Sequence, residues 1–332
     1  MSLHGWIILD KPHGMGSTQA VAAVKRALRE AGEPKTKIGH GGTLDPLATG
    51  VLPVAIGEAT KLAGRMLDSD KIYDFTCRFG VQTDTLDLEG VEIARSAVRP
   101  TLAEVEAVLA RFTGPIEQAP PAYSAIKVDG KRAYDLARAG EAVEMKTRSV
   151  TVHNLFLPDT GRGTVAEGDG GGGSPDGPHP EARTLHQPAT GSPPRIGEEV
   201  ESVTLTAHVS KGTYIRSLAR DIALALGTVG HVTMLRRTKA GPFTLDSAIS
   251  LDKLRDAANE RAIGRLMLPL TAGLDDIPAL PVTPDEASAL RQGRVLAGKP
   301  HTGLMLAMQG DTPIALVQAL GPEIRVVRGF NL

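Results

Sequence analysis

The sequence predicts an α+β fold, in which a mixed, mainly antiparallel sheet forms the larger domain and a small β-rich module follows it. Segments typical of strands and of helices alternate irregularly along the 332 residues, unlike the regular strand–helix order of a parallel sheet. Residues 203–209, Val-Thr-Leu-Thr-Ala-His-Val, alternate apolar and polar side chains, as a half-buried antiparallel strand does. A proline cluster at residues 269–281 marks the boundary before the C-terminal module.

The elements of the larger domain can be placed in order along the chain. Short apolar runs predict strands over residues 6–10, 51–56, 73–81 and 203–209. Apolar residues at helical spacing predict helices over residues 18–31, 102–113 and 215–226. We expect Ser17 or Thr18 to cap the first helix and Thr101 to cap the second, because their side-chain oxygens can accept from free backbone N–H groups.

Residues 159–200 differ from their surroundings. They contain ten glycines and six prolines and show no hydrophobic periodicity, so we interpret them as a disordered insertion within a domain over residues 1–268. The segments on either side, 147–157 and 200–209, resemble sequential strands that would be neighbours in the sheet.

The C-terminal module is expected over residues 278–332. Three apolar runs, at 303–308, 313–317 and 324–327, are separated by turn residues at 309–311 and 321–322. This pattern is typical of short strands joined by tight turns.

Composition narrows the class of protein. The chain has one cysteine, Cys77, which excludes an internal disulfide and suits a reducing compartment; it is expected to be buried in a strand. No apolar stretch reaches the length of a membrane span, and the N-terminus has no secretory pattern, so we expect a cytoplasmic protein. The net charge is −1, but residues 205–245 carry six Lys or Arg against one acid, which favours a local phosphate-binding surface.

The most informative segment is residues 39–50, Gly-His-Gly-Gly-Thr-Leu-Asp-Pro-Leu-Ala-Thr-Gly. It places the carboxylate of Asp45 in a glycine-rich turn, where little side-chain bulk would block a planar ligand. Pro46 biases Asp45 toward an extended conformation. A structural turn aspartate is the alternative reading of this pattern.

This segment resembles the catalytic motif of the bacterial tRNA pseudouridine-55 synthases, the TruB family. Further motifs of that family occur along the chain in the same order as in the family. They are Leu-Asp-Lys-Pro at 9–12, Lys-Ile-Tyr at 71–73, Tyr-Ser-Ala-Ile-Lys at 123–127, Ser-Lys-Gly-Thr-Tyr-Ile-Arg at 210–216 and Leu-Arg-Arg at 235–237. The resemblance covers roughly residues 5–255 and implies a pseudouridine-synthase fold with a C-terminal RNA-binding module similar to the PUA domain.

The resemblance implies a role for each residue of a candidate site. Asp45 would act on a uridine in RNA as nucleophile or base, two roles that the sequence leaves open. Tyr73 would stack on the target base, His40 would contact the RNA, and Tyr214 and Leu235 would line the base pocket. For Tyr73 and Leu235 a core position is the alternative, and for His40 a hydrogen bond to nearby backbone.

Basic residues complete the candidate site. By resemblance, Arg216 would pair with Asp45 and keep it ionised; a solvent-exposed arginine at the start of a helix is the alternative. Lys11, Lys127, Arg236 and Arg237 are candidates for binding phosphates. The nine histidines show no metal-ligand spacing and no nucleotide-binding motif is present, so we expect neither a metal nor a cofactor.

Taken together, the sequence predicts an enzyme that isomerises the uridine at position 55 in the T arm of tRNA. We expect tRNA as its partner, no membrane association, no obligate protein partner and a monomeric state. Two alternatives stay open: a non-catalytic tRNA-binding or tRNA-folding protein on the same scaffold, and a hydrolase in which Asp84 or Asp87 would be the carboxylate partner of Asp45.

Overall fold

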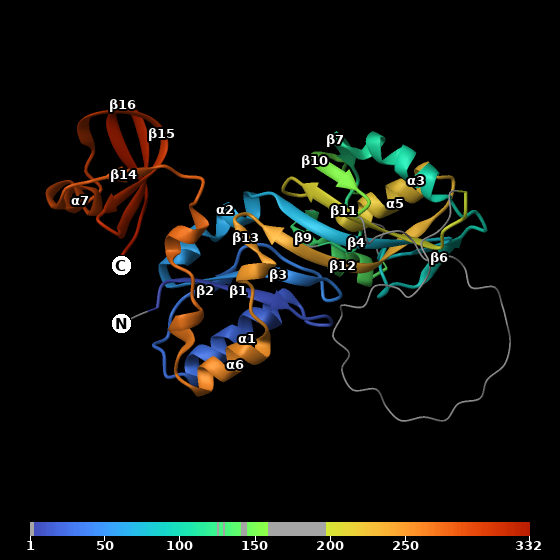
Figure 1. Cartoon of the computed structure of the whole chain (residues 1–332), viewed down its shortest axis with the longest axis horizontal. Coiled ribbons are helices and arrows are strands. Elements are labelled where there is room, and N and C mark those ends of the chain that lie inside the picture. Colours follow the sequence, from blue (N-terminus) through green and yellow to red (C-terminus); the bar gives the residue numbers. More distant parts are fainter. Residues whose placement is uncertain (1–2, 125, 129, 141–144, 159–196) are drawn as a thin grey trace. The chain divides into compact units, whose positions relative to one another are not determined.

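The computed structural model describes residues 3–124, 126–128, 130–140, 145–158 and 197–332. The insertion expected over 159–200 lies almost entirely outside these residues, so its disorder stays a prediction. The chain forms two compact units. The first unit is Met1–Ser69 with Arg237–Leu332, and the second is Asp70–Arg236 (Figure 1). The fold is mixed α+β with mainly antiparallel sheets, as predicted.

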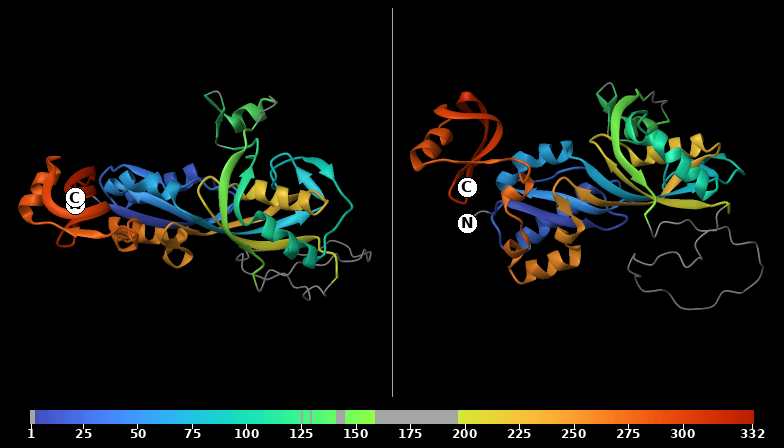
Figure 2. Two further views of the ribbon diagram at one scale, coloured as in Figure 1. Left: turned by 90° about the horizontal axis from the view of Figure 1, so that it is seen from above. Right: turned by 45° about the horizontal axis from the view of Figure 1, so that its top comes forward.

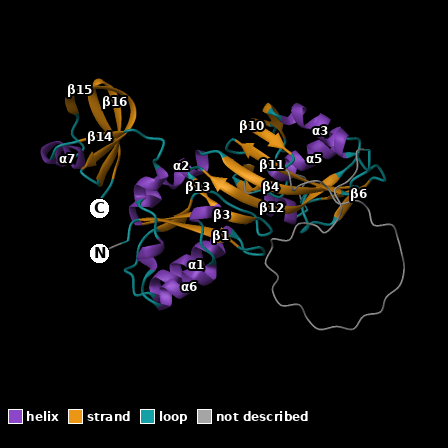
Figure 3. Ribbon diagram, viewed as in Figure 1, coloured by secondary structure: helices purple, strands orange, loops and turns teal. Residues whose placement is uncertain are grey.

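The first unit contains a small antiparallel sheet. Strands β1 (Gly5–Lys11) and β3 (Thr49–Ile56) pair over their whole length, and β2 (Ile38–His40) also pairs with β3. Alternation is lost in β1 because both of its faces are buried: Trp6, Ile7, Ile8 and Leu9 are each at most 1% exposed. Helices α1 (Ser17–Glu30) and α6 (Leu251–Asn259) lie side by side in this unit (Figures 1 and 3).

The start of α1 differs from the prediction. Gly16 is the N-cap residue and Ser17 is the first residue of the helix. The amide N–H of Gly16 is bonded by the side chain of Gln19, which satisfies one exposed backbone donor. The hydroxyl of Ser17 does not cap the helix and instead donates to the backbone carbonyl of Leu44, in a loop distant in the sequence.

The C-terminal residues of the first unit form a separate three-stranded sheet. Strand β14 (Ala279–Pro281) is parallel to β15 (Leu296–Gln309), which forms a hairpin with β16 (Thr312–Gly329). Helix α7 (Pro284–Arg291) lies beside this sheet (Figure 2). Its Ala287 and Leu290 belong to the buried cluster that the sheet residues form. The turn at 309–311 is confirmed, but residues 321–322 continue β16 and only interrupt its register. The domain boundary expected at 268–278 stays a prediction.

The second unit contains a four-stranded antiparallel arrangement in the order β4-β11-β10-β7. The strands are β4 (Lys71–Phe79), β11 (Ser202–Val209), β10 (Arg148–Phe156) and β7 (Gly114–Gln118). The segments on either side of the insertion are therefore neighbours, as expected. Smaller elements of this unit are β5 (Val81–Thr83), β6 (Glu92–Arg95), β8 (Lys127–Val128), β9 (Lys131–Arg132) and α4 (Ala133–Arg138).

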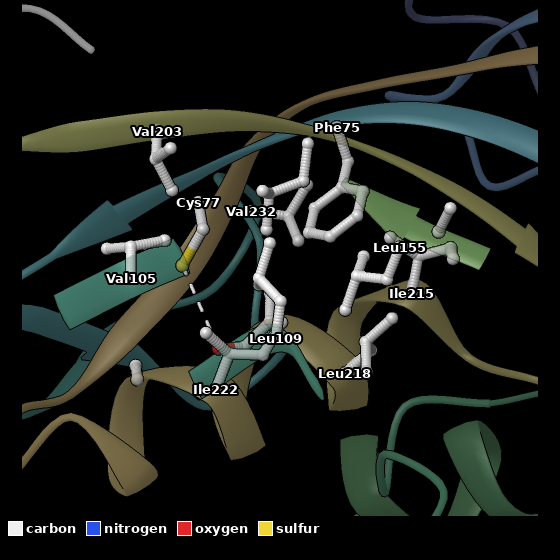
Figure 4. Close-up of a cluster of buried hydrophobic side chains, with 14 of the residues drawn as sticks. Phe75, Cys77, Val105, Leu109, Leu155, Val203, Ile215, Leu218, Ile222 and Val232 are labelled. Atoms are coloured by element: carbon white, nitrogen blue, oxygen red, sulfur yellow. Dashed lines mark hydrogen bonds between the residues drawn. The ribbon is translucent and has the colours of Figure 1, made fainter. Parts of the chain in front are cut away.

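Two helices cover one face of that arrangement. Helix α3 (Leu102–Leu109) begins at Thr101, whose hydroxyl accepts from the Glu104 N–H in a capping box, as predicted. Helix α5 (Ile215–Ala225) turns Ile215, Leu218 and Ile222 toward Phe75 of β4 (Figure 4). The resulting cluster of buried side chains is the core of the second unit.

Cys77 lies inside this core. It is fully buried on β4, as expected, and burial raises the pKa of its thiol to about 12. Its Sγ lies 3.7 Å from the Ala219 carbonyl oxygen (Figure 4). Strand β4 ends at Phe79, two residues before the predicted end, because Gly80 takes a positive φ of 90° that breaks the strand before β5.

The last long strand, β12 (Gly230–Ala240), contributes residues to both units. Its residues up to Arg236 belong to the second unit, and those from Arg237 onward belong to the first. Strand β13 (Phe243–Thr244) pairs with its end in the first unit. In the part of the chain that the structure describes, no helix is long and apolar enough to cross a membrane.

Candidate active site

The segment between β2 and β3, residues 41–48, is called here the Asp45 loop. The side chain of Asp45 is half-buried, and its backbone carbonyl accepts from the Ala48 N–H at 3.1 Å in a tight turn. The backbone of the loop, and not the carboxylate alone, is held by the surrounding protein. Three polar side chains of the first unit do this.

The first is Ser17, which sequence analysis read as a helix cap. Its hydroxyl donates to the Leu44 carbonyl at 2.9 Å and accepts from the Leu44 N–H at 2.8 Å. Both residues are buried, so these bonds satisfy backbone groups that water does not reach. Ser17 therefore fixes the residue directly before Asp45. The sequence offered one signal for it, a serine at a predicted helix start.

The second is Lys11, whose residue is fully buried at the end of β1. Its ammonium donates to the carbonyls of Met15 at 2.6 Å, Pro12 at 3.0 Å and Pro46 at 3.2 Å. An ammonium has three donors, and all three are used here. The pKa of Lys11 is lowered to about 8, because the effect of burial outweighs that of the Asp45 carboxylate, which raises it. Lys11 therefore holds the residue directly after Asp45.

The third is Arg237, which is 1% exposed. Its guanidinium donates to the backbone carbonyls of Val51 at 2.7 Å, Gly42 at 3.1 Å and Thr43 at 3.4 Å. This burial is inconsistent with the phosphate contacts that we expected of Lys11 and Arg237. Both cations instead bind carbonyl oxygens on either side of Asp45, and their charge stays within the protein.

Two glycines let the backbone approach these anchors. Gly50 has a φ of 98°, and a Cβ there would lie 2.2 Å from the Arg237 carbonyl oxygen. A Cβ on Gly41 would lie 2.4 Å from the Cβ of Met66. Neither position accepts a side chain without a shift of backbone or of packed atoms, so Gly41 and Gly50 serve close packing of the chain around the loop.

His40 lies at the end of β2, immediately before the loop. Its Nδ1 accepts from the Gly42 N–H at 3.4 Å, so it does bond nearby backbone. Burial, and then the positive charge of Arg237, lower the pKa of His40 below its usual value. The ring is therefore neutral at pH 7, and its contact with RNA stays a prediction.

In the second unit, Tyr73 and Leu235 flank the hydrophobic core. Both are half-buried and pack against the cluster that contains Phe75 and Cys77. Tyr73 shares one face of β4 with these two residues and lies near the start of the strand. Each side chain thus has a core contact as well as exposed area. The stacking role of Tyr73 and the pocket role of Leu235 stay predictions.

Tyr214 is the N-cap residue of α5, and a buried amide holds its backbone. Gln118, which is fully buried, donates to the Tyr214 carbonyl at 3.2 Å and accepts from the Tyr214 N–H at 2.8 Å. The guanidinium of Arg148 lies 4.9 Å from the centroid of the Tyr214 ring, within the range of a cation–π contact. Gln118 and Arg148 were not singled out from the sequence, because both contact Tyr214 from far along the chain. Gln118 lies about a hundred positions before Tyr214, and Arg148 lies about seventy positions before it.

Arg216 is 5% exposed, so the alternative of a solvent-exposed arginine is wrong. Its guanidinium donates to the carbonyls of Thr85 at 2.7 Å and Tyr123 at 2.9 Å, and lies 3.3 Å from a carboxylate oxygen of Asp87. Asp87 is also buried. The pairing of Arg216 with Asp45 would join residues of the two units, and it stays a prediction.

The two carboxylates considered for a hydrolase have structural partners in the second unit. Asp87 also accepts from the Thr85 hydroxyl at 2.5 Å, in addition to its contact with Arg216. Asp84 accepts from the Tyr123 hydroxyl at 3.0 Å and from the Val91 N–H at 2.9 Å. The Asp84 contact raises the pKa of Tyr123. These contacts favour structural roles for both aspartates.

Of the remaining predicted phosphate ligands, Arg236 is half-buried, and the side chain of Lys127 lies outside what the structure describes. The first unit contains an exposed basic region that was not singled out from the sequence. Lys25, Arg26, Arg29 and Lys35 line a pocket of about 530 Å³ beside α1. Glu33 is the one acid among its lining residues.

Comparison with known families and relatives identifies related proteins. Residues 25–165 match the family model described as TruB family pseudouridylate synthase (N terminal domain), and residues 216–275 match the tRNA pseudouridylate synthase B C-terminal domain. The tRNA pseudouridine synthase B of Novosphingobium aromaticivorans is 57% identical over 329 residues, which are 99% of this chain and 97% of the relative. That of Zymomonas mobilis is 55% identical over 331 residues, with the same coverage.

Solved structures share the fold. A Cbf5-Nop10-Gar1 complex contains a chain that superposes with a TM-score of 0.65 at 25% identity, covering 98% of this chain and 85% of the other. An H/ACA RNP bound to a substrate RNA containing 2'-deoxyuridine gives a TM-score of 0.66 at 24% identity, with 99% and 85% coverage. Both likenesses agree with the α+β architecture described above.

Proposed function

Because this chain belongs to the TruB family of pseudouridylate synthases, we propose that it isomerises the uridine at position 55 in the T arm of tRNA. Formation of pseudouridine in tRNA is the activity for which relatives 55–57% identical over nearly the whole chain are named. The chain is thus an enzyme that converts uridine in tRNA to pseudouridine. The position of the uridine, the catalytic residue and the monomeric, cytoplasmic state belong to the proposal.

One observation carries the assignment of Asp45 as the catalytic residue. The loop on both sides of Asp45 is fixed by Ser17, Lys11 and Arg237, and all three bonding groups act on backbone atoms. A loop held in this way keeps its carboxylate in one place before the substrate arrives. Such preorganisation is what a group that must attack or deprotonate a bound nucleotide requires.

The chemistry needs a carboxylate and no group that supplies energy, since the reaction is an isomerisation. Asp45 acts as nucleophile or as base while the bond between base and ribose breaks. The base then turns and is rejoined through carbon. The Asp45 carboxylate in turn opposes the lowering of the Lys11 pKa that burial causes.

We assign substrate binding to residues of both units. Tyr73 offers a flat ring on which a base taken out of its stack would lie, and Tyr214 and Leu235 line the pocket. Unpaired loop bases are the usual target of specific RNA recognition. The exposed cations beside α1, including Lys25 and Arg29, are placed to bind phosphates of the tRNA. Residues 278–332 are proposed as an RNA-binding module.

The proposal is tested by mapping pseudouridine in an unmodified tRNA transcript after incubation with the protein. We expect modification at position 55 alone. A matched transcript with cytidine at that position should stay unmodified. Modification at other uridines, with position 55 untouched, would contradict the proposed site while leaving the enzyme class intact.

The same assay separates the two alternatives. A non-catalytic tRNA-binding protein would bind the transcript and leave every uridine unchanged. A hydrolase would cleave the transcript or release uracil and leave an abasic site. The family membership and the structural roles of Asp84 and Asp87 favour the isomerase.

A further inference from the structure

Three side chains that commonly bind metal ions meet in the second unit, and the proposed reaction uses none of them. They are Asp70, His153 and His208. One carboxylate oxygen of Asp70 lies 3.2 Å from Nε2 of His153 and 3.8 Å from Nε2 of His208. The three ligand atoms all lie within 4.8 Å of one another.

Three adjacent strands supply one ligand each. Asp70 directly precedes β4, and His208 on β11 pairs with Ile72 of β4. His208 alternates with the buried Ala207 and Val209, so its side chain is on the face opposite the hydrophobic core. The cluster therefore lies on the outer face of the arrangement, away from the α5 side.

A β-bulge supplies the third ligand. The pairing of β10 with β11 shifts between Val152 and Asn154, which leaves His153 as an extra residue. Val152 is buried, whereas His153 and Asn154 are both exposed, so the bulge turns two consecutive residues toward the outer face. The rings of His153 and His208 then lie 4.8 Å apart, tilted by 48°. A regular strand would not present His153 in this position.

The donor set and its spacing fit one class of ligand. Two imidazoles and one carboxylate suit divalent transition metals, and zinc accepts this set with a fourth, open position for water. In a tetrahedral zinc site with bonds of about 2.0–2.1 Å, neighbouring donor atoms are about 3.3 Å apart. The two Asp70–histidine distances, 3.2 and 3.8 Å, are close to this value before any ion is present.

The remaining adjustment is small. The two histidines must approach each other, and their side chains are 37% and 40% exposed, so rotation about their own bonds requires no repacking of the core.

We propose that Asp70, His153 and His208 form a binding site for a divalent transition-metal ion, with Zn²⁺ the best-fitting ion. The bound ion links β10 and β11 to the residue before β4 and stabilises the second unit.

The site is tested with Zn²⁺ itself on the full chain, prepared without a histidine tag and treated with a chelator. Calorimetric titration at pH 7.5 should show one ion bound per chain, and Zn²⁺ should raise the unfolding temperature. His153→Ala and His208→Ala should each weaken binding at least about tenfold, since each removes one of three protein ligands. His301→Ala, which changes an exposed histidine of the first unit, is the control and should bind as the parent does.

Two further measurements guard against a variant that simply misfolds. Asp70→Asn keeps the size of the side chain and removes its charge, and it should also weaken binding while circular dichroism stays that of the parent. Co²⁺ should give the visible absorption of a tetrahedral site in the parent and not in the variants. Binding should weaken in acid, because protonated histidine cannot bind a metal. A parent that binds no Zn²⁺, or variants that bind it as tightly as the parent, would overturn the proposal.

Discussion

The Asp45 loop and the aromatic residues of the second unit are positioned by different forces. Around Asp45, charged and polar side chains reach backbone carbonyls: Lys11 and Arg237 each make three such bonds. Tyr73, in contrast, packs its ring against a hydrophobic cluster. Directional bonds fix a backbone in one place, whereas packing fixes a ring and tolerates small changes. The two regions should therefore respond differently to substitution.

The largest expected effect is that of Asp45→Asn, which should abolish isomerisation. The amide keeps the shape of the side chain but loses the charge and nucleophilicity that the reaction requires. Affinity for tRNA should stay within about tenfold of the parent, or roughly 1.4 kcal/mol. Single-turnover assays and binding titrations measure the two effects separately. Residual turnover of a few per cent, in a preparation free of host enzyme, would mean that Asp45 is not essential.

Ser17→Ala tests the polar side of the comparison. It leaves the N–H and C=O of the buried Leu44 without their partner, and such a loss costs about 1–3 kcal/mol of stability. Turnover should fall as well, because the residue before Asp45 is no longer fixed. Thr18→Ala changes the adjacent, exposed residue of the same helix and serves as the control. Equal stability and turnover for the two variants would show that Ser17 does not hold the loop.

Tyr73→Phe and Tyr73→Ala test the packed side. Phe keeps both the stacking face and the core contact, so RNA binding should persist, and any loss of turnover would report on the hydroxyl. Ala removes the ring, and stacking is worth about 1–3 kcal/mol per base. Binding of an RNA stem-loop by all three proteins is the measurement. Identical affinities would rule out stacking of Tyr73 on the bound nucleotide.

The smallest expected effect is a pH dependence from Lys11. Its pKa in the folded chain is about 8, below the usual 10.5. Between these values the unfolded chain holds a proton that the folded chain has lost, so this residue makes stability rise with pH in that window. The free energy of unfolding of the parent, relative to Lys11→Met, should therefore grow by on the order of 1 kcal/mol from pH 8 to pH 10. A difference that stays constant or shrinks would contradict the lowered pKa.

Much of the fold could be predicted because its signals are local. The alternation of residues 203–209 predicted β11, and Thr101 as a capping residue predicted the start of α3. Apolar runs gave β1 and β3, and Cys77 is buried as expected. Helix α7 was missed although Thr283 and Glu286 form a capping box there; it lies between the proline cluster at 269–281 and the first apolar run at 303–308, the two features that were interpreted.

The site was predicted less completely, and the reason is physical. Asp45 and His40 could be selected from the sequence because they belong to one contiguous motif. The anchors of the loop are different, because their partners are backbone carbonyls, which leave no trace in side-chain chemistry. Lys11 and Arg237 therefore resembled phosphate ligands until their burial was known. The metal-ligating cluster depends on strand register and on one bulge, and neither can be derived from the spacing of histidines.

We infer that the two cations around Asp45, Lys11 and Arg237, hold the loop and do not bind the RNA. The most direct test is the salt dependence of tRNA binding for Lys11→Met, compared with Lys25→Met on the exposed face of α1. A lysine that binds a phosphate contributes about one unit to the slope of log affinity against log salt. We expect the slope of Lys11→Met to equal that of the parent, and that of Lys25→Met to be smaller by about one unit. A slope reduced by about one unit in Lys11→Met would contradict the account.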